Sequence, residues 1–203
     1  MGKVKLTKGE LKGQRDALRR YERYLPILQL KKQQLQIEIL HHVALVEDRR
    51  HKADAKRREI EAWAGLLAEK GINLKEWLTP KKKIAGVKNI AGVDIPVFDR
   101  VEFEVPEYDL FVTPLWVDNA IEALEGLVSL LEEIRALEEG IRILRAELRI
   151  TTQRVNLFEK VKIPEAEDII RIIKVYLGDQ MANAVGRSKI AKRKIEEVEM
   201  AAV

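Results

Sequence analysis

The sequence has no cysteine, few aromatic residues and no long apolar run. The missing cysteine excludes disulfides and thiolate metal ligands and is compatible with a reducing cytoplasm. Aromatic residues make up only 5% of the 203 residues, whereas charged residues make up 34%. That balance favours a long helical assembly over a compact globule. No stretch approaches the roughly 18 consecutive apolar residues of a membrane span, so we expect a chain that is not membrane-spanning.

The net charge says little about the kind of binding partner. The chain carries 37 basic and 33 acidic residues, with a formal net charge of +4 and a pI near 9.2. A strongly basic protein would indicate nucleic acid or an anionic membrane as a partner. This modest excess favours a solvated helical surface of mixed charge.

A heptad pattern runs along residues 7–67. Apolar residues alternate there at spacings of three and four, the period of a left-handed coiled coil. Pro26 lies inside the run and should kink the helix or remove one hydrogen bond. The seam consists of Leu11, Gln14, Leu18, Tyr21, Leu25, Leu28, Lys32, Leu35, Ile39, His42 and Val46.

A stronger pattern of the same period follows residue 115. Its seam consists of Leu127, Leu130, Ile134, Leu137, Ile141, Leu144, Leu148, Thr151, Val155 and Phe158, and after Pro164 it continues through Ile170, Ile173, Leu177, Met181 and Ala184. The two patterns predict a mainly α fold, a long antiparallel two-helix left-handed coiled coil. Its parts are an N-terminal helix in residues 1–78 and a C-terminal helix in residues 115–203.

Charge patterning predicts the register. If Leu67 and Val117 both lie near the turn, residue n of the first helix faces about residue 184 − n of the second, and positions 53 and 131 face each other. Basic residues then oppose acidic ones on both flanks of the seam, which favours this register. The opposed sets are Arg49, Arg50, Lys52, Lys56, Arg57 and Arg58 with Glu125, Glu132 and Glu133, and Arg15, Arg19 and Arg20 with Glu165, Glu167 and Asp168.

The segment 79–114 differs in composition, being rich in Val, Ile and Phe. Val87–Ile90 and Val93–Phe103 are predicted strands around an Ala91-Gly92 turn. Pro96 indicates that the second strand is an edge strand or starts with a bulge. We expect a small β-hairpin at the far end of the helical hairpin, where the first helix pattern ends near Trp77.

Motifs for catalysis and metal binding are missing. There is no Walker loop, G-x-G-x-x-G, G-x-S-x-G or H-E-x-x-H. Glu38 and His42 share a helix face, but a metal needs three or four ligands. Glu138 and Glu139 are adjacent on a helix and point in different directions, so paired-carboxylate chemistry is disfavoured. No catalytic, cofactor-binding or metal-binding residue is predicted.

Both ends of the chain are basic. Lys8, Lys12 and Arg15 lie near the start, and Arg187, Lys189, Lys192 and Arg193 lie near the end. In an antiparallel hairpin these segments share one end. Two interpretations carry equal weight: a tip that docks against an acidic or polar partner, and a frayed, soluble end.

The sequence TTQRVNLFEKVKIPEAEDIIRIIKVYL (151–177) resembles the signature of the D subunit of V-type rotary ATPases and ATP synthases. The opening helix resembles that family at Thr7, Leu11, Leu18 and Lys31…Leu35, and the hairpin at Asn89, Gly92 and Pro96. The matching positions in the C-terminal run are Thr151, Arg154, Val155, Asn156, Glu159, Ile163, Pro164, Ile170, Ile173 and Leu177.

The resemblance implies a non-catalytic central rotor shaft that transmits torque between a catalytic head and a membrane ring. Its termini would enter the head formed by A and B subunits, the F subunit would bind the side of the coiled coil, and the C subunit would hold the membrane-side end. The family's hairpin is implicated in regulating ATP hydrolysis. The chain would be cytoplasmic and peripheral to the plasma membrane, within a complex that moves H⁺ or Na⁺.

Two alternatives stay open. A coiled-coil adaptor or a nucleic-acid-binding protein could use the basic end, in which case DNA binding would depend steeply on salt. An enzyme built in a helical bundle would need inward polar clusters. The seam offers only isolated Gln14, Lys32 and His42.

Overall fold

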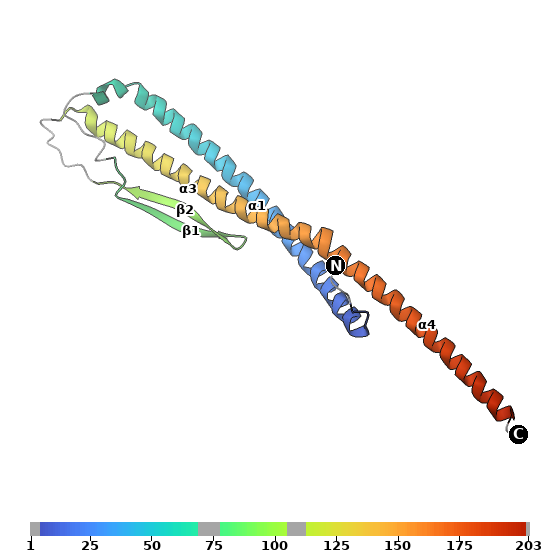
Figure 1. Ribbon diagram of the computed structural model, residues 1–203. Coiled ribbons are helices and arrows are strands. Elements are labelled where there is room, and N and C mark those ends of the chain that lie inside the picture. The colour runs from blue at the N-terminus through green and yellow to red at the C-terminus, as the bar shows by residue number, and fades with distance from the viewer. Residues whose placement is uncertain (1–4, 69–77, 105–112, 202–203) are drawn as a thin grey trace. The chain divides into compact units, whose positions relative to one another are not determined.

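The computed structural model describes residues 5–68, 78–104 and 113–201. The fold is mainly α, with a long helix pair and one two-stranded antiparallel sheet, as predicted (Figure 1). The elements in chain order are α1 (Lys8–Glu61), the 3₁₀ helix η1 (Ala64–Ala68), β1 (Lys82–Ile90), β2 (Val93–Glu102), α3 (Trp116–Leu157), the π-helix η2 (Phe158–Lys162) and α4 (Ile163–Ala201).

Helix α1 ends at Glu61, earlier than the predicted helical segment 1–78, and Trp77 lies outside the described residues. The domain boundaries 1–78, 79–114 and 115–203 stay a prediction. The chain divides into two compact units, Met1–Leu30 with Thr152–Val203 and Lys31–Thr151, which we call the terminal unit and the central unit. Each is described by itself.

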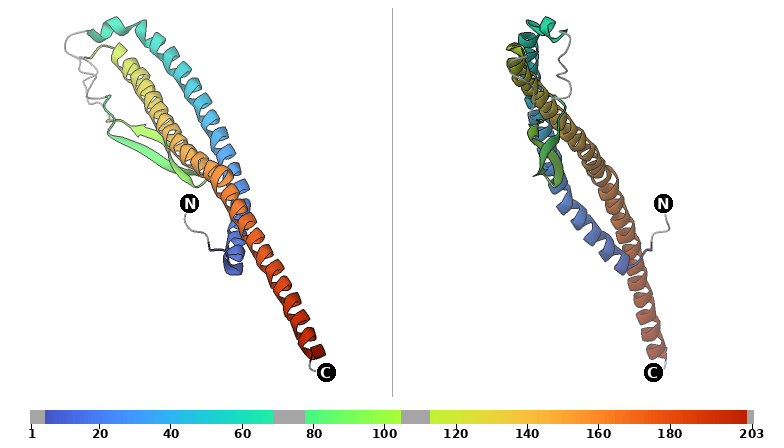
Figure 2. Two further views of the ribbon diagram at one scale, coloured as in Figure 1. Left: turned by 45° about the vertical axis from the view of Figure 1, so that its right-hand side comes forward. Right: turned by 90° about the vertical axis from the view of Figure 1, so that its left-hand side faces the viewer.

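In the central unit, α1 and α3 run antiparallel and side by side (Figures 1 and 2). Ion pairs join Lys31 to Glu147 (2.7 Å) and Arg49 to Glu133 (2.7 Å), so residue numbers rise on one helix as they fall on the other. Arg49 and Glu133 were predicted to be opposed. Position 131 does not face position 53, however, because Leu131 is 42% exposed while Ala53 is buried. The register prediction is therefore correct only to within a few residues.

The predicted seam forms the core of the central unit. One cluster contains Val46, Ala53, Ile134 and Ile141, with Leu127, Leu130 and Leu137 packed against it. Seam positions alternate at three and four, so they return to one helix face and can be buried together. His42, a polar seam residue, is also buried; its Nδ1 atom lies 2.8 Å from the Glu38 carbonyl oxygen of the preceding turn.

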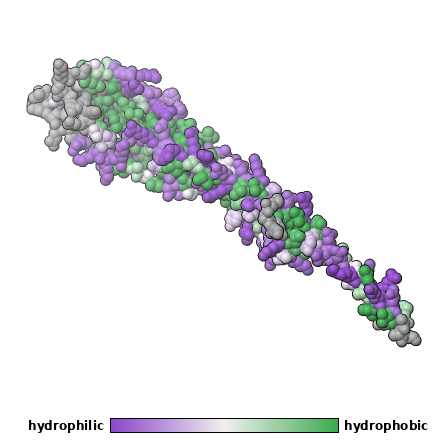
Figure 3. All heavy atoms as spheres, in the orientation of Figure 1, coloured by the Kyte–Doolittle hydropathy of each residue, from purple (hydrophilic) through white to green (hydrophobic). Residues whose placement is uncertain are grey.

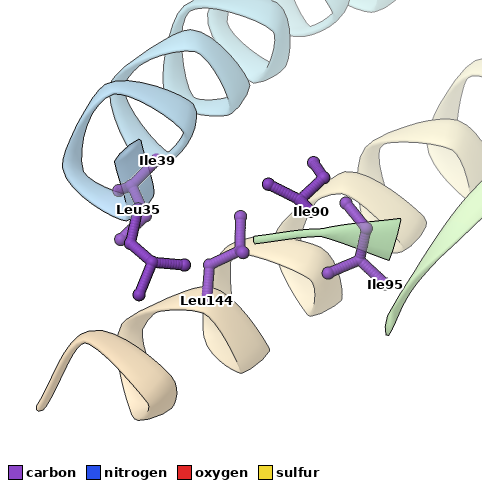
Figure 4. Packing of buried hydrophobic residues seen from close by; sticks show 5 residues of the cluster. All are labelled: Leu35, Ile39, Ile90, Ile95 and Leu144. Atoms are coloured by element: carbon purple, nitrogen blue, oxygen red, sulfur yellow. The ribbon is translucent and has the colours of Figure 1, made fainter. Parts of the chain in front are cut away.

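The hairpin is not at the far end of the helix pair. Ile90 of β1 and Ile95 of β2 pack against Leu35 and Ile39 of α1 and Leu144 of α3 (Figure 4). The hairpin therefore lies along the helices (Figure 2). A two-stranded sheet is at best marginally stable alone, so covering its apolar face is what holds it. The predicted place was wrong because the position of the hairpin segment between the two helices in the sequence does not determine in which direction its strands fold back.

The terminal unit pairs the start of α1 with η2 and α4. Tyr21 stacks on Phe158 with ring centroids 5.4 Å apart, and Leu18 lines a groove with Ile170. In this unit, Val155, Ile170 and Ile173 of the second seam are buried, and Ala166, outside the predicted seam, is buried as well. Leu11, Leu18, Leu25 and Leu28 on α1 are half-buried.

Two of the acidic residues predicted to face α1 across the terminal unit form ion pairs with nearby residues of the sequence instead. Asp168 bonds to Arg171 (2.7 Å) and Glu165 to Lys162 (3.2 Å), each within three residues along the chain. Among the described residues, neither carboxylate forms an ion pair with Arg15, Arg19 or Arg20. Neighbours three residues apart on a helix meet at little entropic cost, which explains the preference.

The two prolines act differently. Before Pro164 the helix widens into η2, where the Ile163 N–H donates to the Phe158 carbonyl oxygen five residues earlier. Proline lacks an N–H and its ring displaces the carbonyl four residues back, and a π-turn accommodates both effects. At Pro26, α1 continues as one helix from Lys8 to Glu61.

The register can be checked with paired cysteines. Leu130 packs against the cluster that contains Ala53, whereas Leu131 points outward. We expect the pair Ala53→Cys and Leu130→Cys to crosslink with a short thiol-reactive reagent at least several-fold faster than the control pair Ala53→Cys and Leu131→Cys. Crosslinking yield over time on denaturing gels is the measurement, and a faster reaction of the control pair would reject this register.

Candidate functional site

The last turns of α4 have no partner helix within the described part of the terminal unit. All described residues from 178 to 198 are exposed. Leu18 of α1 lies beside Ile170 and Lys174 of α4. Only residues 8–17 of α1 precede this contact, whereas α4 continues beyond it to Ala201. We call residues 178–198 the unpaired α4 segment.

The unpaired α4 segment is basic. Lys192 and Arg193 form ion pairs with Glu196 (3.7 Å) and Glu197 (3.0 Å) on the same helix. No ion pair is seen for Arg187, Lys189 or Lys194 among the described residues, and all three are exposed. The segment therefore presents net positive charge to an approaching partner.

The segment also carries scattered apolar groups. Met181, Val185, Ile190 and Ile195 are each more than half exposed. Figure 3 shows apolar and polar side chains intermingled at this end of the chain. The described residues 178–198 include no aromatic side chain, so the surface offers charge and small apolar contacts.

The predicted basic groups do not form a single cluster. Lys8, Lys12 and Arg15 are exposed on the first turns of α1. Arg187, Lys189, Lys192 and Arg193 lie farther along α4, beyond the paired part. The offset arises because α4 continues to Ala201, well beyond its contact with Leu18 of α1. In the sequence, the long run that follows Leu177 was the signal for it.

The hairpin turn is locked by Asn89. Its Oδ1 accepts the Gly92 N–H (3.1 Å), and its Nδ2 donates to Asp94 Oδ1 (2.6 Å). Ala91 and Gly92 have φ values of 52° and 78°, the two positive values that a type I′ turn requires. Gly92 adopts this conformation easily, whereas Ala91 is strained, and the Asn89 bonds offset that strain.

Pro96 lies opposite Val87 in the ladder. A residue without an N–H is tolerated in a strand only where that N–H would not pair. The sheet has two strands, so Pro96 is in an edge strand as predicted. The irregularity in the ladder falls elsewhere, between Ile84 and Ala85.

An ionic contact ties the base of the hairpin to α3. Lys83 donates to Glu132 (2.7 Å), and Arg135 also pairs with this nearly buried carboxylate. Burial by itself raises the pKa of Glu132, but the Lys83 hydrogen bond and the Arg135 charge outweigh it, so the pKa lies below its usual value. Sequence reasoning paired Glu132 with α1 and missed its strand partner, because Lys83 is one of three successive lysines.

The described residues contain neither a metal-binding cluster nor a membrane-spanning helix. In residues 5–68, 78–104 and 113–201, no cluster of three His, Asp or Glu side chains could hold a metal ion. Over the same ranges, no helix is long and apolar enough to cross a membrane. The two surfaces described above, the unpaired α4 segment and the hairpin, form the candidate site.

Comparison with known proteins gives consistent matches. The family model for the ATP synthase D subunit matches residues 10–193. The V-type ATP synthase D subunit of Borreliella burgdorferi is 45% identical over 192 residues, covering 95% of each chain. The protein of the same name from Chlamydia trachomatis is 32% identical over 196 residues, covering 96% of this chain and 97% of its own. That of Chlamydia abortus is 34% identical over 200 residues, covering 96% of this chain and 94% of its own.

The contact between Glu132 and Lys83 should make stability pH-dependent. Because the folded pKa is lowered, the stabilisation is present above the ordinary value of 4.5 and is lost as the pH falls through the folded value. We expect Glu132→Gln to lower the free energy of unfolding by about 1–2 kcal/mol at pH 7, with a smaller difference at pH 3.5. Denaturant titrations at both pH values measure it.

Asp99→Asn is the matched control for this prediction. Asp99 is an exposed hairpin carboxylate with no ion pair among the described residues, so its loss should leave the unfolding free energy nearly unchanged at pH 7. A pH-independent effect of Glu132→Gln would contradict the proposed contribution of the carboxylate charge.

Proposed function

This chain belongs to the ATP synthase D subunit family, and from this premise we propose that it is the central shaft of a V-type ATP synthase or ATPase. The shaft transmits torque between a catalytic head of A and B subunits and the rotor ring in the membrane. The chain itself is non-catalytic, and ATP is handled between A and B. It works in the cytoplasm, peripheral to the plasma membrane. The family match over residues 10–193 carries this proposal.

The helix pairing supports torque transmission. A single helix bends and twists easily, whereas two helices joined along a seam resist both. In the central unit the seam is flanked by ion pairs between the helices, including Lys31 with Glu147 and Arg50 with Glu138 (2.6 Å). Ion pairs at the surface of the helix pair add little stability, but they oppose sliding of one helix along the other.

The unpaired α4 segment is suited to the cavity of the head. A tip that turns inside a sleeve has to meet each surrounding subunit in turn without locking onto one. Mixed small apolar and basic groups provide weak contacts that acidic loops can attract. The proposed contact residues in the segment are Arg187, Lys189, Lys192 and Arg193, and those near the start of α1 are Lys8, Lys12 and Arg15.

The outer face of α1 supports binding of the F subunit on the side of the coiled coil. In the terminal unit Tyr24, Ile27 and Leu30 are each more than half exposed at spacings of three residues. Exposed apolar side chains that recur along one face mark an interaction surface. The C subunit is proposed to hold the opposite, membrane-side end.

The proposal predicts how the α4 tip affects coupling. We expect deletion of residues 186–203 to lower the number of ions pumped per ATP hydrolysed several-fold, because the deletion removes the proposed contacts between the shaft and the catalytic head. Binding of the F subunit should be retained, since the deleted residues lie beyond the paired helices. Parallel assays of ATP hydrolysis and ion transport in reconstituted vesicles, with the subunits of the complex identified on gels, measure both.

The control is deletion of residues 199–203 alone, which leaves Arg187 to Lys194 in place and should preserve coupling. Loss of the F subunit on the longer deletion, or full coupling without the tip, would contradict this arrangement. Recovery of the chain on nucleic acid and free of any ATPase subunit would support the adaptor or nucleic-acid alternative instead.

A further inference from the structure

The hairpin leaves one strand edge open. A two-residue turn places Ile90 and Val93 in a hydrogen-bonded pair, and such pairs alternate along an antiparallel ladder. The residues between them direct their N–H and C=O groups away from β2. On β1 these outward residues are Ala85, Val87 and Asn89. The described chain forms a sheet of only two strands, so no third strand there meets these groups.

The other edge of the sheet is blocked. Pro96 lies opposite Val87, at a position where the strand nitrogen points outward. Proline has no N–H, so the outer edge of β2 lacks a donor in its middle. β1 contains no proline, and Val87 is 74% exposed. Only β1 is therefore able to extend the sheet along this stretch.

A groove lies beside the end of β1 within the central unit. One wall consists of Lys88, Asn89, Ile90 and Ala91, and the other of Gln34, Ile37 and Glu38 on α1. Its volume is about 340 Å³, and Ile37 on its helical wall is 65% exposed. A strand edge facing a helix across a groove can accept an extended peptide, with backbone bonds on one side and side-chain contacts on the other.

The charge of β1 indicates the kind of peptide. The strand carries Lys82, Lys83 and Lys88 and no acidic residue. Lys83 is engaged by Glu132, but no ion pair is seen for Lys82 or Lys88 among the described residues. A second copy of β1 would bring lysines against lysines, which disfavours pairing between copies. An acidic strand complements the edge.

We propose that the outer edge of β1 binds an extended acidic segment of another subunit as a third strand of the sheet. The segment lies in the groove against α1, bonds to the backbone of Ala85, Val87 and Asn89, and places a carboxylate near Lys88. This inference rests on the proposed function, because the partner is a subunit of the same complex.

Amide hydrogen exchange in the isolated chain and in the complex purified from native membranes tests the proposal. In the isolated chain, the ladder amides of Gly86, Lys88 and Ile90 should exchange slowly and the outward amides of Ala85, Val87 and Asn89 fast. In the complex, the outward amides should slow at least tenfold. Residue-resolved mass spectrometry measures both sets, and fast exchange of the outward amides in the complex would overturn the proposal.

Val87→Pro separates strand pairing from simple coverage. The substitution removes an outward N–H without deleting a ladder bond to β2. It should restore fast exchange at Ala85 and Asn89 in the complex while Gly86 and Lys88 stay protected. Val87→Thr keeps the N–H and is the matched control. Unchanged protection at Ala85 and Asn89 in Val87→Pro would reject strand addition.

Lys88→Glu tests the acidic character of the partner. In the complex, Lys88→Glu should speed hydrogen exchange of the outward amides at least several-fold, whereas Lys88→Arg should leave it unchanged. Equal exchange rates in the two variants would reject an acidic segment. A chain that does not copurify with the complex contradicts the proposed function. A chain that copurifies but keeps fast outward amides contradicts only this inference.

Discussion

Each long helix has one apolar stripe, and a stripe can be removed from water only against another surface. The antiparallel seam of α1 and α3 meets this constraint in the central unit, where Val46 and Ala53 pack with Ile134 and Ile141. Helices of this length gain most of their stability from such packing rather than from intrinsic propensity. The other features of the fold depend on where this apolar seam is covered by another element and where it is exposed to solvent.

The hairpin is a third element that packs on the seam, and this packing stabilises it. Leu35, Ile39 and Leu144 bury Ile90 and Ile95, so the strands depend on the helices for their apolar contacts. The ionic contact of Lys83 with Glu132 fixes the hairpin a second time, near its base. One face of the sheet is thereby committed to the helices while the edge of β1 stays available, which is the condition for adding a strand.

Where the seam loses its partner, α4 is left in solvent. Ile173 is fully buried, yet every described residue from 178 to 198 is exposed. The helix continues there with basic and small apolar residues that suit contacts with other chains. Paired and unpaired parts of one helix thus have different roles, packing in the first and proposed docking in the second.

Much of this was determined by the sequence itself. The alternation of Leu35, Ile39, Ile134 and Ile141 predicted the seam because helical periodicity is a local property, and Ala91-Gly92 predicted the turn because few residues adopt positive φ. Only the tertiary structure decided where the hairpin packs, that Glu132 pairs with Lys83, and that Asp168 pairs within its own helix. Those outcomes depend on which surfaces meet after folding, and several lysines and carboxylates could have satisfied the same local pattern.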